Sequence, residues 1–242
     1  MSDKTFRKDK DVEKIIGVDL GVRHDAVCAA LLKDGTVTGR KFIRSSVEKD
    51  RLLKVLHTIR KCYQKGSYHT KRLWRFVNNY QRTIEINTAK AIIEFALKEN
   101  ADVIVFENLH GFHPSYMTEK IHLWRKRAIQ RRVESMASRN GIRVSYVHAA
   151  NTSKLAFDGS GPVTRDKKNF SIGTFASGKR YHVDLSASYN IGARYWLRVY
   201  EKTTPVKVWC DIKAKVPSVS LRTKQTLSTL INVARVTGIR AA

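Results

Sequence analysis

Residues 12–20 have the sequence VEKIIGVDL and set the first strand of the fold. A run of branched apolar residues that is typical of a buried strand leads into Asp19. Gly17 and Gly21 flank this carboxylate, and glycine at such positions allows other backbone to approach closely. We therefore expect Asp19 to stand at the end of a buried strand, with backbone packed closely around it.

Two more strands are expected directly after the first one. Residues 25–33 (DAVCAALLK) and residues 36–43 (TVTGRKFI) have strand-like patterns, and Asp34 and Gly35 between them are a strong hairpin signal. The chain therefore opens with three antiparallel strands, and Asp19 lies at the end of the first.

A fourth apolar run, residues 102–107 with the sequence DVIVFE, is short and bounded by polar residues. This pattern is typical of a parallel strand that is buried on both faces, and Glu107 ends it. The other expected elements are helices over 46–63, 69–99, 119–139 and 185–200, a strand over 142–147, an irregular insertion over 148–181 and a peripheral tail over 205–242.

The order of these elements predicts the fold class. Three antiparallel strands are followed by two strands that are each reached through helices, and right-handed crossovers place those two strands parallel to the first. This is the order of the RNase H-like (RuvC-type) α/β fold, in which helices flank a mixed five-stranded sheet. We expect one nuclease-like domain over 1–204, which includes the insertion, and the tail outside it.

Three carboxylates fall at convergent places in this fold. Asp19 and Glu107 end neighbouring strands, and Asp184 starts the last helix and faces them. Each alone is a weak signal, since an acidic residue at a strand end is usually solvated and Asp184 alone would most often be a helix N-cap. Together, in a chain where acidic residues are scarce, they predict a site that needs a compensating cation, because clustered carboxylates repel one another.

Such a site suits phosphodiester hydrolysis. The reaction needs an activated water and a stabilised leaving oxygen, and two divalent ions about 3.5–4 Å apart supply both. Mg²⁺ prefers hard oxygen ligands. Three carboxylates from separate elements are enough to hold such a pair, so we predict that Asp19, Glu107 and Asp184 are both metal ligands and catalytic residues.

The charge of the chain points to a polyanionic partner. Its 46 Lys and Arg residues against 21 Asp and Glu residues give a formal net charge of +25. We expect nucleic acid, with a basic ribosomal-type or membrane-surface protein as the alternative. The basic residues are spread over the whole chain, which favours a long groove or face over a disordered arm.

Other features limit the class of protein. The sequence has no run of 18 apolar residues that could span a membrane, and its polar N-terminus lacks the apolar core of a secretory signal. Cys28, Cys62 and Cys210 have no CxxC spacing and are too few for a four-cysteine zinc site. We expect a reduced, cytoplasmic protein.

The segments IIGVDLG, VIVFENL and VDLSASYNIGARYW resemble the three RuvC motifs of TnpB-type proteins. These OrfB-family transposases are transposon-encoded relatives of type V CRISPR effectors. The resemblance extends over nearly the whole chain and includes NGIRVSYV and NTSKLAFDGSG. It implies that Asp19, Glu107 and Asp184 are the catalytic carboxylates of a DNA endonuclease that uses Mg²⁺ or Mn²⁺, with two ions, and a guide RNA.

The sequence departs from this family in two ways. Many members carry a zinc ribbon with four cysteine ligands between the second and third motifs, whereas residues 148–181 contain no cysteine. We therefore expect no structural zinc, and an insertion that other contacts hold. Members also usually carry about as much chain again before the first motif, where guide RNA and target DNA are gripped. Here that part would come from a separate chain, or the protein would be a truncated product.

A basic helix supplies candidate nucleic-acid contacts. Arg125, Lys126, Arg131 and Arg132 lie within residues 119–139 and are expected to line a groove, with a merely solvated face as the alternative. Arg194 is expected to reach a phosphate, with packing of its aliphatic stem as the alternative.

Two more residues are candidates for support of the carboxylates. His182, two residues before Asp184, could transfer a proton or position one of the carboxylates, although such a residue is more often an ordinary loop residue. Asn190 is expected to fix the third-motif helix against the site, and solvent exposure is the alternative.

The most direct interpretation is a divalent-metal-dependent DNA endonuclease domain. A rival from another class is a truncated, non-cleaving nucleic-acid-binding remnant or regulator. The complete set of three carboxylates argues against a loss of chemistry, and the short segment before the first motif argues for a loss of targeting. A stand-alone RNase H or junction resolvase is disfavoured by the long 148–181 insertion and by the SASYNIGARYW segment.

Overall fold

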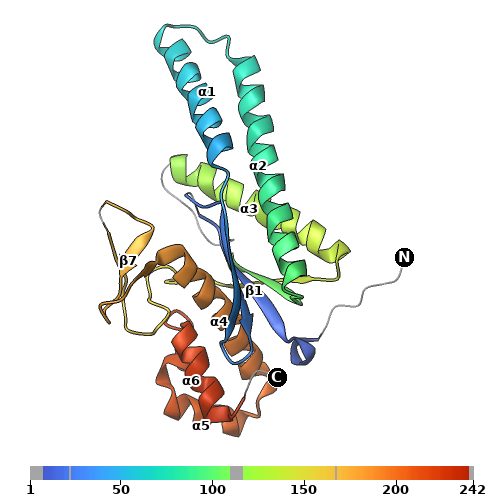
Figure 1. The fold of residues 1–242 in the computed structure, drawn as a ribbon, viewed down its shortest axis with the longest axis vertical. Helices are drawn as coiled ribbons and strands as arrows, with labels where there is room; N and C mark the ends of the chain where they lie inside the picture. The colour runs from blue at the N-terminus through green and yellow to red at the C-terminus, as the bar shows by residue number, and fades with distance from the viewer. Residues whose placement is uncertain (1–7, 22, 110–116, 167, 240–242) are drawn as a thin grey trace.

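A five-stranded sheet lies at the centre of the molecule, with helices on both faces (Figure 1). The computed structural model describes residues 8–239 except 22, 110–116 and 167, and the side chains of residues 10 and 117–124 also lie outside this description. A short 3₁₀ turn, η1 (Asp9–Asp11), precedes the sheet. Asp9 in this turn accepts hydrogen bonds from Arg143 at 2.5 Å and Tyr195 at 3.3 Å, so it ties the start of the described chain to two later elements.

The sheet has the predicted strand order, β3-β2-β1-β4-β5. Its strands are β1 (Lys14–Asp19), β2 (Ala26–Leu32), β3 (Val37–Ile43), β4 (Val103–Asn108) and β5 (Arg143–His148). β1 pairs antiparallel with β2 and parallel with β4, and β5 runs parallel to β4. This mixed sheet with flanking helices confirms the predicted fold class.

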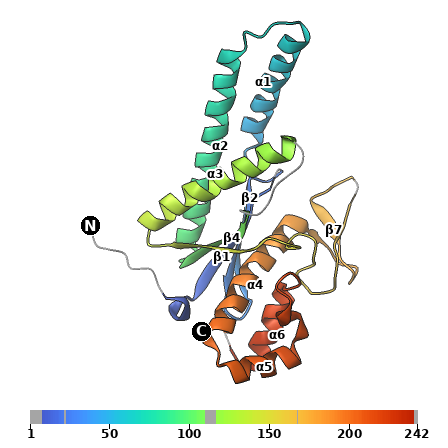
Figure 2. The ribbon, with the colours of Figure 1, turned by 180° about the vertical axis from the view of Figure 1, so that it is seen from behind.

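Helices cover the two faces of the sheet in different ways (Figures 1 and 2). The larger helices are α1 (Ser46–Gln64), α2 (Lys71–Lys98), α3 (Met117–Arg139) and α4 (Val183–Thr203). Buried residues of α2 and α3 share one apolar core with one face of the sheet, and α4 shares a second core with the other face. The sheet is therefore the middle of three layers.

Alternation along β1 decides which face each residue meets. Ile16 and Val18 belong to the core under α2 and α3, while Ile15 belongs to the core under α4. Gly17 and Asp19 follow Ile15 at every second position of β1, so they lie on the same face as Ile15. The carboxylate at the end of β1 therefore lies on the face that α4 covers.

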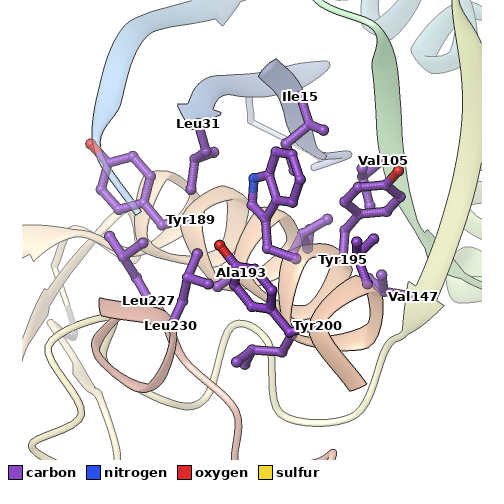
Figure 3. Packing of buried hydrophobic residues seen from close by; sticks show 14 of the residues in the cluster. Ile15, Leu31, Val105, Val147, Tyr189, Ala193, Tyr195, Tyr200, Leu227 and Leu230 are labelled. Atoms are coloured by element: carbon purple, nitrogen blue, oxygen red, sulfur yellow. The ribbon is translucent and has the colours of Figure 1, made fainter. Parts of the chain in front are cut away.

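α4 is buried along almost its whole length. Figure 3 shows its side chains Tyr189, Ala193, Tyr195 and Tyr200 among residues of the sheet on one side and of α6 (Leu227–Thr237) on the other. A helix that is apolar on all sides is typical of a position between two layers. This enclosure fixes the position of the helix whose first turn carries Asp184.

The hairpin of α1 and α2 extends beyond the sheet (Figure 1). Its outer part has a separate small core that contains Leu52, Ile59 and Val77. The outer part of the hairpin therefore depends on its own packing, whereas the C-terminal half of α2 packs on the sheet.

The insertion contains more regular structure than the sequence predicts. It forms a three-stranded antiparallel sheet of β6 (Thr164–Arg165), β7 (Ile172–Thr174) and β8 (Arg180–His182). These strands are two or three residues long, too short for an alternating pattern to be recognised. The expectation of an irregular insertion over 148–181 is corrected in this respect.

Aromatic packing holds the insertion against α4. The ring of Phe157 lies 4.9 Å from that of Tyr181 and 5.3 Å from that of Tyr189, and the Lys179 ammonium stands 4.9 Å from the Phe157 ring centroid. The hydroxyl groups of Tyr181 and Tyr189 are hydrogen-bonded at 3.0 Å. These contacts connect the insertion to the helix that carries Asp184.

The C-terminal segment 205–242 is not the expected peripheral tail within its described part. It forms α5 (Val206–Lys215), the 3₁₀ turn η2 (Pro217–Ser220) and α6, and Trp209, Leu230 and Val233 are buried in the same core as α4. Pro205 and Pro217 mark helix starts here and do not interrupt the fold. The expectation failed because the short apolar stripes of these helices gave a weak pattern.

Within the part of the chain that the structure describes, no helix is both long enough and apolar enough to cross a membrane.

Candidate metal centre

The structure brings Asp19 and Glu107 to the same edge of the sheet. The register of the parallel pair β1 and β4 matches Val18 with Phe106, so Asp19 and Glu107 follow as the next residues on adjacent strands. Val105 belongs to the core under α4, and Glu107, two residues later, lies on the same face as Asp19. Asp184 enters this face from the first turn of α4.

Glycines let α4 approach β1 closely. A Cβ atom at Gly17 would lie 2.3 Å from the carbonyl oxygen of Ser188 and 3.0 Å from the backbone nitrogen of Gly192, both on α4. A Cβ atom at Gly21 would lie 2.9 Å from the carbonyl oxygen of His24, so this glycine lets the turn after β1 fold back closely. The absence of a side chain at Gly17 therefore lets α4, whose first turn carries Asp184, pack closely against β1.

The electrostatics of Asp19 reflect this convergence. Its side chain is buried, and burial together with the negative charges of Glu107 and Asp184 raises its pKa to about 8. The positive charges of Lys126 and Arg165 oppose this shift without cancelling it. Asp19 is therefore a buried carboxylate in a field that favours a proton or another cation beside it.

Glu107 is held by a residue of the insertion. The Thr152 hydroxyl is hydrogen-bonded to Oε1 of Glu107, and Thr152 is buried. The side-chain amide of Gln130 on α3 donates to the backbone carbonyl of Glu107 at 3.0 Å. The sequence alone does not single out Thr152, because nothing in the composition of the insertion distinguishes it from neighbouring polar residues.

Asn190 has a structural role that agrees with one of its two predicted alternatives, since it is fully buried and not solvated. Its amide nitrogen donates to the carbonyl oxygens of Thr152 at 3.0 Å and Leu155 at 2.9 Å, and its oxygen accepts from the backbone nitrogen of Leu227 at 3.1 Å. Asn190 therefore fixes the backbone on which Thr152 reaches Glu107.

Two histidines stand beside Asp184. Among the described residues, His24, His182 and Asp184 form a group whose metal-ligating atoms all lie within 4.8 Å of one another, and Asp19 and Glu107 are not members of this group. The Nδ1 atom of His24 lies 3.6 Å from Oδ2 of Asp184. Burial lowers the pKa of His182, and the nearby charge of Asp184 opposes that shift. His182 was a candidate from the sequence, whereas His24 was missed because it follows the first motif without a recognisable spacing.

The predicted basic residues of α3 divide into two kinds. Arg125 is paired with the buried carboxylate of Asp25 at 2.6 Å, and Arg132 is paired with the buried Glu85 at 3.2 Å. These two arginines therefore connect α3 to neighbouring elements. Arg131 is exposed, and Lys126 contributes its charge to the environment of Asp19.

The expectation that Arg194 reaches a phosphate is wrong. Arg194 is buried, and its guanidinium donates to carbonyl oxygens of four residues. These acceptors are His148 at 2.5 Å, Ala150 at 2.8 Å, Gln225 at 3.2 Å and Thr223 at 3.2 Å. Burial lowers its pKa to about 10, with the charge of Glu107 in opposition, so the side chain stays protonated at neutral pH. Arg194 connects the end of β5 and the residues just after it to the segment before α6.

The carboxylates have the chemistry that a divalent cation requires. They offer hard oxygen atoms from three separate elements. Burial, and after it the charges of Glu107 and Asp184, raise the pKa of Asp19, so the negative charges at this place are poorly compensated by the protein itself. A cation between them would compensate these charges. The residues present therefore fit a Mg²⁺ or Mn²⁺ site.

Comparison with known proteins places this geometry in a family context. The chain is 29% identical over 173 residues to a TnpB-like protein of Aquifex aeolicus (strain VF5). The match covers 61% of this chain and 56% of that protein. This likeness to a TnpB-like protein agrees with the resemblance that the three sequence motifs carry. No protein-family model matches it.

The fold of this chain is also similar to that of solved structures. A Cas12f1–sgRNA–target DNA complex matches with a TM-score of 0.55 at 18% identity, over 76% of this chain and 50% of that chain. A CRISPR-Cas12f ternary complex matches with a TM-score of 0.53 at 18% identity, over 78% of this chain and 39% of that chain. An AacC2c1–sgRNA binary complex matches with a TM-score of 0.57 at 10% identity, over 76% of this chain and 39% of that chain. At these identities the likeness concerns the fold, and it agrees with the RNase H-like prediction. The chain spans about half the length of these relatives, or less.

Proposed function

We propose that this chain carries a divalent-metal-dependent endonuclease site that hydrolyses DNA phosphodiester bonds. Asp19, Glu107 and Asp184 are the proposed metal ligands. The observation that carries the proposal is the burial of Asp19 against the charges of the other two carboxylates, since such an arrangement asks for a cation. Kinship with a TnpB-like protein supports the choice of a nuclease.

The ions, when bound, would activate water and stabilise the charge that develops on the leaving oxygen. The chain itself does the positioning. Glu107 is oriented by the Thr152 hydroxyl, and Thr152 is fixed through its backbone by Asn190. Lys126 adds positive charge near Asp19, where a phosphate would enter, and Arg131 offers an exposed charge on the same helix.

The proposed partners are DNA and a guide RNA. The net charge of +25 supports a polyanionic partner, and solved structures with this fold are complexes that contain sgRNA. We also propose that a separate chain could supply recognition parts that the longer relatives carry within one chain.

The test is cleavage of labelled single- and double-stranded DNA by the purified chain with Mg²⁺, Mn²⁺ or a chelator. We expect cleavage that needs the metal and falls at least about a hundredfold in Asp19→Asn, Glu107→Gln and Asp184→Asn. Asp211→Asn, at an exposed position on α5, is the matched control and should cleave normally. Cleavage that survives Asp19→Asn would overturn the site assignment. DNA binding without cleavage in either metal would instead support a non-cleaving nucleic-acid-binding protein. Sequencing of RNA that co-purifies with the chain tests the guide.

A further inference from the structure

The group of His24, His182 and Asp184 lies beside the proposed carboxylate centre and differs from it in chemistry. Two imidazoles and one carboxylate offer nitrogen as well as oxygen, and all three ligand atoms lie within 4.8 Å of one another. The ligand atoms of one tetrahedral zinc-sized ion lie about 3.4 Å apart, since each bond is about 2.1 Å long. The three atoms would therefore have to move closer together, by up to about 1.4 Å, to share one ion.

One nitrogen of each histidine in this group lacks a hydrogen-bond partner. Within the described structure, Nδ1 of His24 and Nδ1 of His182 are buried and make no hydrogen bond. A buried polar atom without a partner is unfavourable, and bound ions are one of the usual reasons for such an atom. The carboxylate Oδ2 of Asp184 is 3.6 Å from Nδ1 of His24, too far for a hydrogen bond between them.

The rings are held in place from the side. The ring of Phe42 on β3 lies 5.3 Å from the His24 ring and 5.0 Å from the His182 ring, and the two imidazoles are 5.1 Å apart. The backbone origins of the group are also fixed, because His182 ends β8 and Asp184 lies in the first turn of α4. The group is therefore built from three different segments of the fold.

Solvent reaches the two histidines through a pocket of about 640 Å³. His24 and His182 line it together with residues from the start of α1 and from the insertion, among them Arg44, Ser46 and Ser171. An ion would therefore have a path of entry, which a credible metal site requires.

We propose that His24, His182 and Asp184 bind a first-row transition-metal ion such as Mn²⁺, Co²⁺ or Zn²⁺ in preference to Mg²⁺. Imidazole nitrogen suits these metals, whereas Mg²⁺ selects oxygen ligands. Binding at this group does not depend on the proposed nuclease function. Asp184 is also a proposed ligand of the carboxylate centre, so an ion bound at this group would share that ligand with the proposed nuclease site.

The experiment is titration of the metal-free full chain with Co²⁺, followed by its visible absorption and by calorimetry. Wild type should bind Co²⁺, and His24→Gln and His182→Gln should each weaken that binding by at least about tenfold. His69→Gln, at an exposed position between α1 and α2, is the matched control and should bind as wild type does. Nitrogen-15 NMR of the imidazoles with Zn²⁺ gives a second readout, in which two rings should change together. Thermal unfolding establishes that both glutamine variants fold.

Unchanged Co²⁺ affinity in both glutamine variants would overturn this inference, as would Zn²⁺ that leaves the imidazole signals unmoved. Neither result affects the proposed nuclease, whose test is loss of cleavage in Asp19→Asn. Conversely, Co²⁺ binding that needs both histidines in a chain that cleaves no DNA would support this site and contradict the proposed function.

Discussion

Gly17 faces the backbone of Ser188 so closely that a Cβ atom on the glycine would lie 2.3 Å from the serine carbonyl oxygen. This contact joins the central strand to α4 and thereby brings Asp184 next to Asp19.

Gly17→Ala should separate the two elements. The new Cβ atom would clash with backbone atoms of Ser188 and Gly192, which cannot rotate away, so α4 would have to move. Overpacking of this kind costs about 1–3 kcal/mol of stability. Urea unfolding measures the loss. Gly39→Ala is the control, because its nearest neighbour is the flexible carboxylate of Glu99, which can rotate away. An equal loss in both variants would contradict a special role for the β1–α4 contact.

Thr152→Val should slow cleavage without unfolding the protein. Valine keeps the shape of threonine but loses the hydroxyl that is bonded to Glu107, so this carboxylate loses its orientation. We expect kcat to fall about ten- to a hundredfold, with a smaller change in KM. Thr152→Ser keeps the hydroxyl and should restore most of the rate. If serine is as slow as valine, the hydroxyl has no positioning role.

Arg194→Met should destabilise the fold strongly. It would leave carbonyl oxygens of four residues without their donor, and each unpaired buried acceptor costs about 1–3 kcal/mol. A loss of at least about 3 kcal/mol in denaturant unfolding is expected. The exposed Arg131→Met should leave stability within about 0.5 kcal/mol but weaken DNA binding and its salt dependence. A stable Arg194→Met protein with weakened DNA binding would restore the phosphate role that we reject.

Asp9→Asn should make the stability of the fold less dependent on pH in the acidic range. Partial burial alone would raise the pKa of Asp9, but hydrogen bonding and charge from Arg143, with a hydrogen bond from Tyr195, outweigh it and lower the pKa below 3.8. A lowered pKa means that the stabilisation is fully present above the unfolded value of 3.8 and is lost as the pH falls through the folded value. The variant should therefore melt at a lower temperature than wild type at neutral pH, and the difference should shrink in acid below that range.

Thermal melts across this pH range measure the effect, and Asp11→Asn, at an exposed position two residues away, is the control. A difference between Asp9→Asn and wild type that is constant with pH would show that the ion pair with Arg143 does not cause it.

The sequence was most informative where burial is complete. The runs around Val18 and Val105 are apolar on both faces of the sheet, so their strands and the carboxylates after them could be predicted from pattern alone. The Asp34–Gly35 turn fixed the register of the next two strands, and Gly35 has the positive φ of 90° that such a turn needs.

Prediction failed where a residue's role depends on distant partners. Arg194 and an exposed arginine look alike in sequence, and the burial of Arg194 among the carbonyl groups of four residues distinguishes them. His24 likewise acquires a partner from far along the chain. The short strands of the insertion and the small helices after Pro205 owe their stability to contacts with α4, which no local pattern contains.

The position of α4 between two layers also determines the order in which the site can assemble during synthesis. Asp19 emerges from the ribosome well before Asp184, which can take its place only after α4 has been made and has docked against Gly17. Its outer side is covered only when α6 follows. The cluster of carboxylates is therefore incomplete from the synthesis of Asp19 until α4 has docked, and the proposed site would become competent only after that step.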